Sequence, residues 1–470
     1  MYQVHTITTP GLAQNSYLLA SGTEAAVIDP RRDVEGYLET ATRLGVAITH
    51  IFETHSHADF LSGGPQLAAA TGATLHISAL VNPAVPHVPL HDGDIFTIGD
   101  ARLTALHTPG HTPEHMAYYV TDAADPAIPP ALFSGDLLFV GDLGRPELLG
   151  QALAQELAPR LYDSVFGIVG MLPPETVLYP GHGAGSLCGK ALSDKPTSTL
   201  GEEFVANPAL QIRDKAEFVA YMLSGQPRVP GNFARMAALN RAGVPLLPEQ
   251  FPAREFRVEE AEAALADPGC LVVDARTPEE YAAAHIPGSV YLGLDPGLPT
   301  WLGWLFPPEK RIVAVVEDAA QAHAYYTWLV RVGYDNLIGY LPEGVARWRK
   351  AGKPLRSLRL AAPDEARRAV EAGRLLVDVR TPREFAGGSL PEARSLPLCE
   401  LPGRLGEIAR DACVTLMCQG GYRGTIAASL LLNAGYPNVE NVVGGYGACA
   451  CAAKEPVGPP EAQRAGVSNQ

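Results

Sequence analysis

The sequence predicts an α/β protein with an α/β sandwich in its first half and two smaller α/β domains in its second half. Three observations lead to this prediction. Short apolar strands alternate with helical segments along the chain, a pattern typical of α/β folds. One segment of the second half recurs about 100 residues later, which is a common domain size. At 470 residues, the chain is also too long for one hydrophobic core.

The first predicted domain covers residues 1–245. Its strands are short and end in Gly, Pro, Asp or His, as in AAVIDP, ITHIFETH, RLTALHTPGH, ALFSGD and TVLYPGH. Polar residues at strand ends lie on loops with a rigid base, where functional sites gather. From 197 to 243 the pattern turns helical, and the Pro-rich stretch that follows predicts a linker at 246–256.

The second half contains an internal repeat. LVVDARTPEEY at 271–281 returns as LLVDVRTPREF at 375–385, and LVRVGYDN returns as LLNAGYPN further along. Each copy shows a helical stretch, a buried strand, a second buried strand and another helix, which predicts a mostly parallel sheet. We therefore expect one α/β domain at 257–355 and another at 356–460.

Charge and cysteine content narrow the function. The chain carries 36 Lys and Arg against 51 Asp and Glu, and this net charge of −15 argues against a nucleic-acid partner or an anionic membrane surface. No apolar run approaches the roughly 20 residues of a membrane span. The N-terminus alternates like a strand and does not match an export signal. The seven cysteines are scattered and odd in number, which predicts reduced thiols in the cytoplasm.

Three predicted strand ends each provide one candidate metal ligand: His55 in HIFETH, His111 in HTPGH and Asp136 in ALFSGD. Two imidazoles and one carboxylate on one face of an octahedron leave three positions open, which suits non-haem Fe(II) and oxygen chemistry. Zinc hydrolases also use His and Asp, so the ligand types alone leave the metal open. The histidines expected to be surface or satisfied core residues are His5, His50, His76, His87, His91, His107, His115, His285 and His323.

Four motifs of the first half match one known family: HSHADF at 55–60, TPGHTPEH with His111, SGDLLF with Asp136 and YPGHG with His182. Together they resemble the metallo-β-lactamase superfamily, and this resemblance implies an αββα sandwich. In dinuclear members such as glyoxalase II, the second metal needs a His at the position of Phe60. Phenylalanine cannot ligate a metal, so the sequence favours a one-metal site.

The branch of the superfamily that a one-metal site matches best is persulfide dioxygenase. Phe60 departs from the animal and plant dioxygenases, which keep a His there, and agrees with the bacterial forms fused to sulfurtransferase domains. The resemblance implies one Fe(II) per chain, held by His55, His111 and Asp136. Residues implied to surround the ligands and orient them are His57, Asp59 and His182. From the residues alone, a ligand role and an orienting role are about equally favoured for both His57 and His182.

Two further residues of the first domain have alternative interpretations. Arg145 follows the candidate ligand Asp136 by nine residues, and by resemblance its fork of donors lies near the site and holds a carboxylate or phosphate of the thiol carrier. A structural ion pair explains Arg145 equally well. Cys188 in GAGSLCGK also resembles the fused bacterial forms, where a sulfur-relay role is one interpretation and a buried inert thiol is the favoured one.

Cys418 is the candidate nucleophile of the second repeat. It follows the predicted buried strand CVTLM, and the loop QGGYRG separates it from a predicted helix. A thiol between a strand end and a helix N-terminus receives converging backbone N–H groups and a positive dipole, which favour thiolate. Gly420 and Gly421 let the loop curl around the substrate sulfur, and Arg423 adds a cation at its rim.

The loop Cys418-Gln-Gly-Gly-Tyr-Arg423 resembles that of rhodanese sulfurtransferases, and VDVRTPREF and VVGGY add to the match over about 100 residues. Six residues fit a single sulfur atom, whereas related phosphatases have a longer loop. Asp378 and Arg380 are expected to form a structural ion pair. The first repeat has AVVEDAAQAHAYY at this place, without Cys, paired Gly or Arg, so it is expected to carry no persulfide. Cys270 is expected to pack, and the pair at 449–451 is too small to predict a metal site.

The two sites together resemble persulfide dioxygenase–sulfurtransferase fusions of bacterial sulfide detoxification. The resemblance implies iron-dependent oxidation of a thiol persulfide with O2 to sulfite, followed by sulfur transfer from Cys418 that gives thiosulfate. The expected partners are the small-molecule persulfide, O2 and further copies of the chain in a homo-oligomer. One alternative is a thioester hydrolase of the glyoxalase II type with two metals. The other is a non-catalytic rhodanese pair that docks a sulfur carrier.

Overall fold

The computed structural model describes residues 1–148, 150–190, 192–226 and 228–452, so the expected end of the last domain at 460 lies outside the described residues. By their contacts, these residues form two compact units. The first holds Met1–Glu249 and Thr327–Tyr334, and the second holds Gln250–Tyr326 and the described residues from Asp335 onward. Among the described residues, no helix is both long and apolar enough to cross a membrane.

The first unit contains two six-stranded sheets. In spatial order, the first sheet consists of β1 (Tyr2–Thr9), β2 (Gln14–Ser21), β3 (Glu24–Ile28), β4 (Ala47–Phe52), β5 (Thr74–Ser78) and β6 (Val88–Leu90). The second sheet consists of β14 (Ser198–Thr199), β13 (Val177–Pro180), β10 (Ala131–Gly135), β9 (Met116–Asp122), β8 (Ala101–His107) and β7 (Ile95–Ile98). A short hairpin of β11 (Leu138–Phe139) and β12 (Asp142–Leu143) follows β10.

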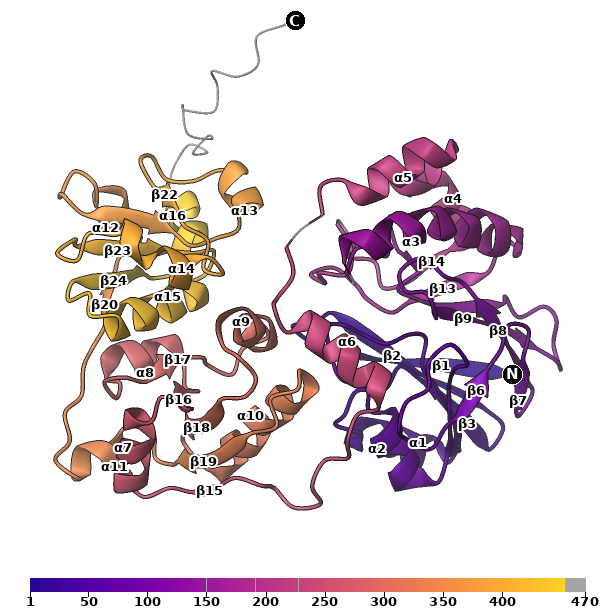
Figure 1. Ribbon diagram of the computed structural model, residues 1–470, viewed down its shortest axis with the longest axis horizontal. Helices are drawn as coiled ribbons and strands as arrows, with labels where there is room; N and C mark the ends of the chain where they lie inside the picture. The colour runs from indigo at the N-terminus through magenta and orange to yellow at the C-terminus, as the bar shows by residue number, and fades with distance from the viewer. Residues whose placement is uncertain (149, 191, 227, 453–470) are drawn as a thin grey trace, which may run out of the picture. The chain divides into compact units, whose positions relative to one another are not determined.

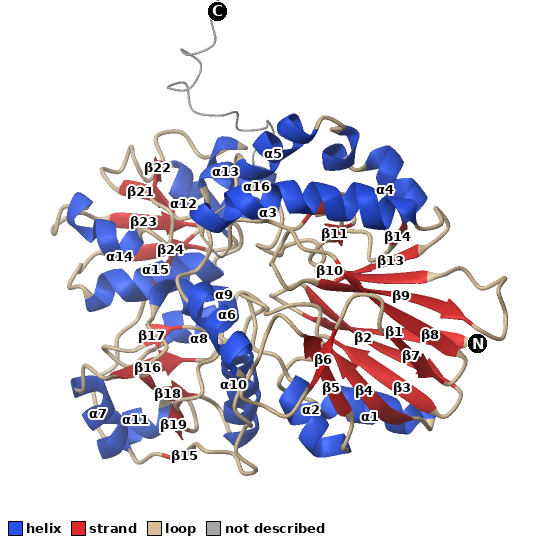
Figure 2. Ribbon diagram, turned by 45° about the vertical axis from the view of Figure 1, so that its right-hand side comes forward, coloured by secondary structure: helices blue, strands red, loops and turns tan. Residues whose placement is uncertain are grey.

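Helices cover the outer face of each sheet (Figures 1 and 2). The first sheet is covered by α1 (Glu35–Leu44) and α2 (Gly64–Thr71). The second is covered by α3 (Gln151–Asp163) and α5 (Lys215–Leu223), with α4 (Leu200–Ala206) nearby. The remaining helical segments are η1 (Ser164–Ile168), η2 (Val169–Met171), η3 (Pro208–Gln211) and α6 (Phe233–Ala242). The unit is thus an αββα sandwich, which confirms the predicted fold class.

The strand sequences explain this layering. Side chains alternate between the two faces of a strand, and in β2 both faces are apolar: Leu19 packs between the two sheets, whereas Leu18 packs under the helices. In β10, Phe133 and Leu132 divide in the same way. Sheets buried on both faces hold their strand ends rigidly, and the candidate ligands follow these ends.

The second unit contains two five-stranded parallel sheets of one topology. The sheet of the first repeat has the order β15 (Arg254–Glu255), β19 (Leu337–Leu341), β18 (Arg311–Val315), β16 (Cys270–Asp274), β17 (Val290–Tyr291). That of the second repeat has β20 (Arg359–Ala361), β24 (Val439–Val442), β23 (Val414–Met417), β21 (Leu375–Asp378), β22 (Arg394–Ser395). The stretch predicted as the linker 246–256 therefore includes β15, which pairs with β19.

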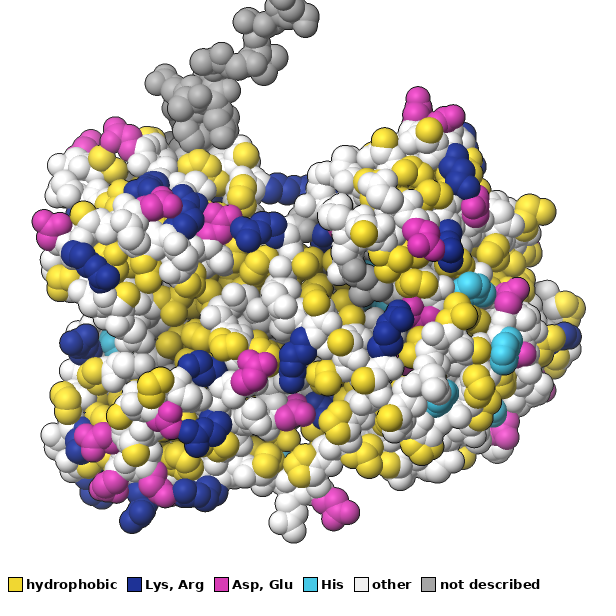
Figure 3. Space-filling view, in the orientation of Figure 1, with side chains coloured by type: hydrophobic (Ala, Val, Ile, Leu, Met, Phe, Trp, Pro, Cys, Tyr) yellow, Lys and Arg dark blue, Asp and Glu magenta, His cyan; other side chains and the backbone are white. Residues whose placement is uncertain are grey.

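Each of these sheets has its own set of helices. Those of the first repeat are α7 (Val258–Ala266), α8 (Pro278–Ala283), α9 (Leu298–Leu305), α10 (Ala319–Arg331) and α11 (Ala346–Lys350). Those of the second are α12 (Pro363–Arg367), α13 (Pro382–Ala386), α14 (Leu401–Arg404), η4 (Leu405–Glu407), α15 (Tyr422–Asn433) and α16 (Gly445–Ala452). On the face in Figure 3, acidic and basic side chains of the described residues are interspersed on each unit.

Candidate metal centre and thiol site

The first candidate ligand, His55, lies in the loop after β4. Asp29, at the end of β3, accepts hydrogen bonds from the backbone N–H and the hydroxyl of Thr54, both at 2.7 Å. The Thr54 hydroxyl oxygen in turn lies 2.9 Å from Nδ1 of His55. These contacts fix the loop and orient the imidazole so that Nε2 lies on the side of Asp136.

His111 and Asp136 come from the loops after β8 and β10. Nδ1 of His111 lies 2.8 Å from the backbone carbonyl oxygen of Arg145, so the ring donates there and keeps a lone pair on Nε2. Asp136 directly follows Gly135, whose φ of +51° and close neighbours leave no room for a side chain: an added Cβ would lie 2.6 Å from Nε2 of His115.

The three candidate ligands converge. Oδ2 of Asp136 lies 3.9 Å from Nε2 of His55 and 3.6 Å from Nε2 of His111, and all three residues are buried. Oδ2 of Asp136 has no hydrogen-bond partner among the described residues. A buried carboxylate oxygen without a partner costs stability unless a cation or a donor satisfies it. The residues therefore fit a metal ion held by two nitrogens and one oxygen.

Burial sets the charge states of these groups. Removal from water lowers the pKa of His111 and, together with the charge of neighbouring His57, lowers the pKa of His55 to well below its usual value. Both rings are therefore neutral near pH 7 and able to ligate. Burial opposes ionisation of Asp136, but the charge of His182 and its hydrogen bond hold the pKa of Asp136 well below the usual range.

His182 and Asp59, predicted to surround the ligands, form a chain behind Asp136. Nδ1 of His182 lies 2.8 Å from Oδ1 of Asp136, and Nε2 of the same ring lies 2.7 Å from Oδ2 of Asp59. Burial lowers the pKa of His182, but the two carboxylates raise it well above its usual value. The ring therefore fixes the orientation of Asp136.

His57 turns away from Asp136 and toward an acidic pair. Its Nε2 lies 3.1 Å from Oδ1 of Asp29 and 3.8 Å from Oε2 of Glu53. Burial lowers the pKa of His57, but Asp29 and Glu53 raise it to about 9. Because Nε2 of His57 faces Asp29 and not Oδ2 of Asp136, the geometry favours an orienting role for His57 over a ligand role.

Sequence reasoning missed several members of this site. Asp29, Glu53 and Thr54 hold His55 and His57, and Asp29 ends a strand in AAVIDP, the same signal that pointed to Asp136. His115 is a satisfied core residue, as expected, but it also contacts the candidate ligand Asp136. It is buried, its Nε2 accepts from the backbone N–H of Asp136 at 3.2 Å, and burial lowers its pKa to about 3.

The thiol site is built at the end of β23. Cys418 is buried, and its Sγ accepts a hydrogen bond from the backbone N–H of Gly421 at 3.0 Å. Gly421 has φ +108°, a conformation that L side chains rarely adopt, and it caps α15. At Gly420, an added Cβ would meet open space. The structure thus brings Gly421 and the N-terminus of α15 to the sulfur.

Arg423 lies in the first turn of α15 and pairs with a carboxylate. Its two terminal nitrogens donate to Glu384 at 2.8 and 2.7 Å. Asp378 and Arg380 form the expected buried ion pair, at 2.7 Å between Nη2 and Oδ2. In the first repeat, Asp274 and Arg276 form the same pair at 2.7 Å.

Comparison with known proteins identifies the families of these parts. Residues 9–182 match the metallo-β-lactamase superfamily, and residues 257–351 and 362–450 each match the rhodanese-like domain. A hydroxyacylglutathione hydrolase-like protein of Mus musculus is 33% identical over 223 residues, which are 41% of this chain and 74% of the mouse protein. The chain belongs to the metallo-β-lactamase superfamily. Two rhodanese-like domains follow its metallo-β-lactamase domain.

Two further relatives extend the comparison. A hydroxyacylglutathione hydrolase of Rhodospirillum rubrum is 35% identical over 159 residues, which are 33% of this chain and 56% of that protein. The crystal structure of a metallo-β-lactamase from Staphylococcus aureus subsp. aureus COL is 34% identical, with a TM-score of 0.66. It covers 73% of this chain and 99% of the staphylococcal chain. That share exceeds the metallo-β-lactamase match, so the likeness extends into the rhodanese part.

Within the metallo-β-lactamase domain, Phe60 is fully buried. Its ring packs on the ring of His57, with 4.3 Å between centroids, and its carbonyl oxygen accepts from Asn240 at 2.8 Å. The aromatic ring therefore takes part in packing at the position where dinuclear members have a ligand.

The side chains of Arg145 and Cys188 are both buried near this site. The Arg145 guanidinium donates to Glu147 at 2.6 Å and to the carbonyl of Leu187 at 2.7 Å, which favours the structural ion pair over the carrier-binding role. The backbone carbonyl of Arg145 is the group that orients His111. Burial raises the pKa of the Cys188 thiol to about 12.

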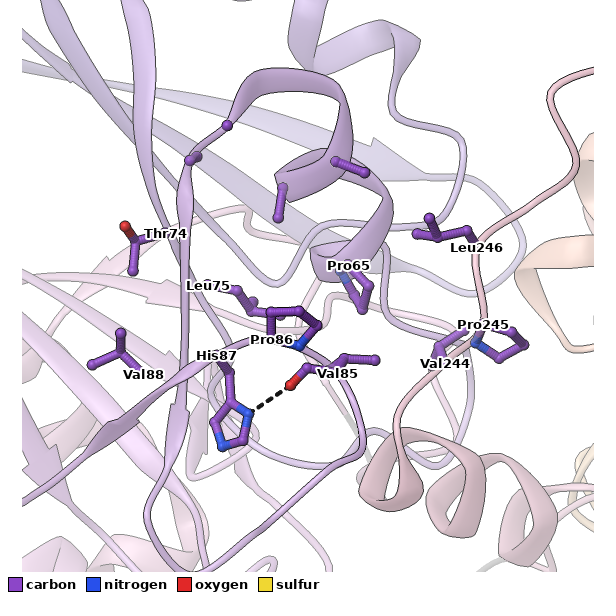
Figure 4. A pocket seen from close by; sticks show the side chains of 14 residues that line it. Pro65, Thr74, Leu75, Val85, Pro86, His87, Val88, Val244, Pro245 and Leu246 are labelled. Atoms are coloured by element: carbon purple, nitrogen blue, oxygen red, sulfur yellow. Dashed lines mark hydrogen bonds between the residues drawn. The ribbon is translucent and has the colours of Figure 1, made fainter.

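Two cavities lie in the same unit. A small one of about 20 Å³, room for about one water molecule, is lined by His55, Glu53 and Asn240 among others. A larger apolar one of about 550 Å³ lies between α2, the β5–β6 loop and Val244–Leu246 (Figure 4). Its lining contains none of the candidate ligands, so it is separate from the metal centre.

Proposed function

We propose that the protein is an iron-dependent persulfide dioxygenase with an attached sulfurtransferase. The observation that supports this most directly is the buried set of His55, His111 and Asp136, with an unpartnered carboxylate oxygen facing two ring nitrogens. Phe60, buried beside this set, supplies no ligand for a second metal. Two histidines and one carboxylate are the ligand set of non-haem Fe(II) oxygenases.

When bound, Fe(II) supplies open positions for a thiolate sulfur and for O2. The chain holds the ligands in place: Thr54 and the carbonyl of Arg145 fix the two imidazoles, and His182 fixes Asp136 through Oδ1. Such supporting contacts typically contribute 10–100-fold to metal affinity or activity. One persulfide, one O2 and one water then give one thiol and one sulfurous acid, which ionises to sulfite.

The second step takes place at Cys418. A persulfide on Cys418 donates its outer sulfur to sulfite, so a new sulfur–sulfur bond forms in thiosulfate while the Cys418 sulfur–sulfur bond breaks. The N–H of Gly421, which donates to Sγ, stabilises the negative charge that returns to the Cys418 sulfur. Under this proposal the protein works in the cytoplasm, as a homo-oligomer, on a small-molecule persulfide.

An oxygen electrode and metal analysis test the proposal. With glutathione persulfide as substrate, the iron-loaded full chain is expected to consume O2 and to release thiosulfate. Cys418→Ser is expected to keep O2 uptake and to shift the product from thiosulfate to sulfite. Unchanged thiosulfate in this variant would refute the sulfur transfer, and the absence of O2 uptake in the native chain would refute the oxygenase.

A thioester hydrolase is the second candidate, because two relatives carry the name hydroxyacylglutathione hydrolase or hydroxyacylglutathione hydrolase-like protein. This alternative predicts two metals in the active form, hydrolysis of a glutathione thioester and no O2 consumption. The same electrode experiment separates the two candidates.

A further inference from the structure

A buried side-chain amide lies directly behind the loop that carries Cys418. It belongs to Asn441 of β24 and faces α15. Nδ2 of Asn441 donates to the carbonyl oxygen of Gly421 at 2.9 Å and to the hydroxyl oxygen of Thr425 at 3.0 Å. The Thr425 hydroxyl in turn donates to the same carbonyl oxygen at 3.0 Å. Two side chains therefore hold the carbonyl of the residue whose N–H donates to the Cys418 sulfur.

Gly421 needs this support because of its conformation. Its φ of +108° lies in a region that L side chains rarely adopt, and a residue without Cβ is free to leave that region. Holding the carbonyl of Gly421 fixes its backbone and therefore the direction of its N–H. We propose that Asn441 is a positioning residue for sulfur transfer, because it keeps this N–H directed at Sγ of Cys418. This role rests on the sulfur transfer proposed above.

An amide at this place lowers the stability of the fold. Oδ1 of Asn441 is buried and has no hydrogen-bond partner among the described residues, and a buried acceptor without a partner is unfavourable. The amide also needs room, because a Cβ added to Gly424 in the first turn of α15 would overlap Oδ1 of Asn441. Glycine is itself unfavourable in a helix. An apolar side chain and an alanine would make a more stable core, so this pair of residues indicates a function for the amide.

The first repeat, which has no thiol at this place, lacks the same arrangement. Asn441 lies three residues before two adjacent residues of positive φ that follow β24, and Tyr340 lies three residues before the matching two that follow β19. Counting seven residues from the ends of β23 and β18, Ala322 stands at the position of Gly424. The amide and the room for it are therefore found in the repeat that has the nucleophile and are absent from the repeat that lacks it.

Asn441→Leu in the full-length chain tests this role, because it removes both donated hydrogen bonds and keeps a side chain of similar shape. Transfer of sulfur from thiosulfate to cyanide should fall by on the order of 10²-fold in kcat, the effect of a small misplacement at a reacting centre. Alkylation of Cys418 by iodoacetamide, followed by mass spectrometry, should need a higher pH, because a misdirected N–H no longer stabilises the thiolate. Asn433→Leu is the matched control: Asn433 lies on the same helix, donates to the carbonyls of Gly288 and Ser289, and should behave like the native residue.

Gly424→Ala is a second variant that keeps every hydrogen-bonding group. Its Cβ should push the amide of Asn441 aside, although alanine is the better helix former. Sulfur transfer and the pH profile of alkylation should change in the same direction as in Asn441→Leu. Gly403→Ala is its control, because a Cβ added there would meet open space. Native behaviour of Gly424→Ala would overturn the role of Asn441, whether or not Asn441→Leu folds.

The pH profile separates a positioning role from a structural one. The charged groups of this site form the pairs Arg423–Glu384 and Asp378–Arg380, and both pairs are unchanged in all variants. A loss of sulfur transfer in Asn441→Leu with a native alkylation profile would therefore mean a structural role and overturn the inference. Alkylation needs no sulfur transfer, so the positioning role of Asn441 and the proposed sulfurtransferase can fail separately.

Discussion

The two rhodanese-like repeats share a scaffold and differ at one loop. Both have the same sheet order and the same buried Asp–Arg pair, Asp274–Arg276 in one and Asp378–Arg380 in the other. In each repeat, the helix after β16 or β21 begins with a Thr–Glu capping box. The scaffold is therefore retained in full where the nucleophile is absent.

The loop after β18 in the first repeat differs from the loop after β23 in the second, in what lies at the helix N-terminus. In the second repeat, the N–H of Gly421 at the start of α15 donates to the Cys418 sulfur. In the first repeat, the carboxylate of Asp318 accepts from the N–H of Gln321 at 2.8 Å, and Gln321 in turn accepts from the N–H of Glu317 at 2.7 Å. In the first repeat, side chains of the loop itself thus bond to N–H groups at the start of the helix.

A second difference lies at the rim of this loop. Counting from the ends of β18 and β23, Gln321 stands at the position of Arg423. Glu384 and the corresponding Glu280 each accept from the Thr of their own capping box, and Glu384 in addition forms a two-point ion pair with Arg423. We infer from this comparison that a sulfur site needs backbone N–H groups that have no other hydrogen-bond partner, as well as a thiol. Four substitutions test this inference.

The largest effect is expected for Cys418→Ser. Removing the nucleophile should lower sulfur transfer by on the order of 10⁶-fold, the scale seen when the catalytic serine of a serine protease is lost. Transfer of sulfur from thiosulfate to cyanide measures it. Cys413→Ser is the matched control and should retain activity, because Cys413 lies just before β23 whereas Cys418 lies just after it. Equal losses in both variants would mean that Cys418 is not the nucleophile.

Tyr422→Phe tests the support that the first repeat gives to the active loop. The Tyr422 hydroxyl donates to the carbonyl of Gly293 at 3.0 Å, and its ring packs edge-on against Tyr291. Leaving the carbonyl unpaired should cost about 1–3 kcal/mol of stability at the junction of the repeats. Hydrogen exchange at α15 measures this, and unchanged protection there would show that the two repeats are independent.

Glu384→Gln tests the rim ion pair through pH. Burial opposes ionisation of Glu384, but Arg423 lowers its pKa to about 2. The folded-state pKa of Glu384 is below its unfolded value of about 4.3. The Glu384–Arg423 ion pair therefore stabilises the folded chain fully above a pH of about 4.3, and this stabilisation is lost as the pH falls toward 2. The difference in thermal midpoint between native and variant chains should shrink over this window. Glu280→Gln is the matched control and should show a smaller change, and equal changes would remove Arg423 as the cause.

The smallest effect is expected for Val316→Cys, which places a thiol in the first repeat at the position of Cys418. Val316 is buried, and the neighbouring donors are already used by Gln321 and Asp318. Sulfur transfer in the Cys418→Ser background should therefore stay at background. A gain of activity would show that a thiol alone is sufficient and would contradict the comparison.

Much of the fold could be predicted from the sequence, because it depends on local patterns. The alternation of short strands with helices predicted the α/β layers, and the return of LVVDARTPEEY as LLVDVRTPREF predicted two domains with one sheet topology. Less obvious was β15: the two residues Arg254–Glu255 are exposed, and pairing with β19 alone makes them a strand. Their sequence carries no apolar pattern that would predict it.

The candidate site could be predicted in part for the same reason. The backbone topology brings the ends of neighbouring strands to one edge of a sheet, whatever side chains they carry. His55, His111 and Asp136 come together in this way. Side-chain direction, by contrast, depends on packing between distant segments. The sequence pointed to the guanidinium of Arg145, whereas its backbone carbonyl contacts His111, and it gave no indication that His57 would turn toward Asp29.

The central claim is a single ferrous ion held by His55, His111 and Asp136. Electron paramagnetic resonance of the iron-loaded chain treated with nitric oxide tests it most directly, because an isolated high-spin ferrous ion gives a nitrosyl signal whose intensity equals the iron content. We predict this signal at one iron per chain, its persistence in Cys188→Ser and its loss in Asp136→Asn. A silent, magnetically coupled pair of irons in the active protein would contradict the account.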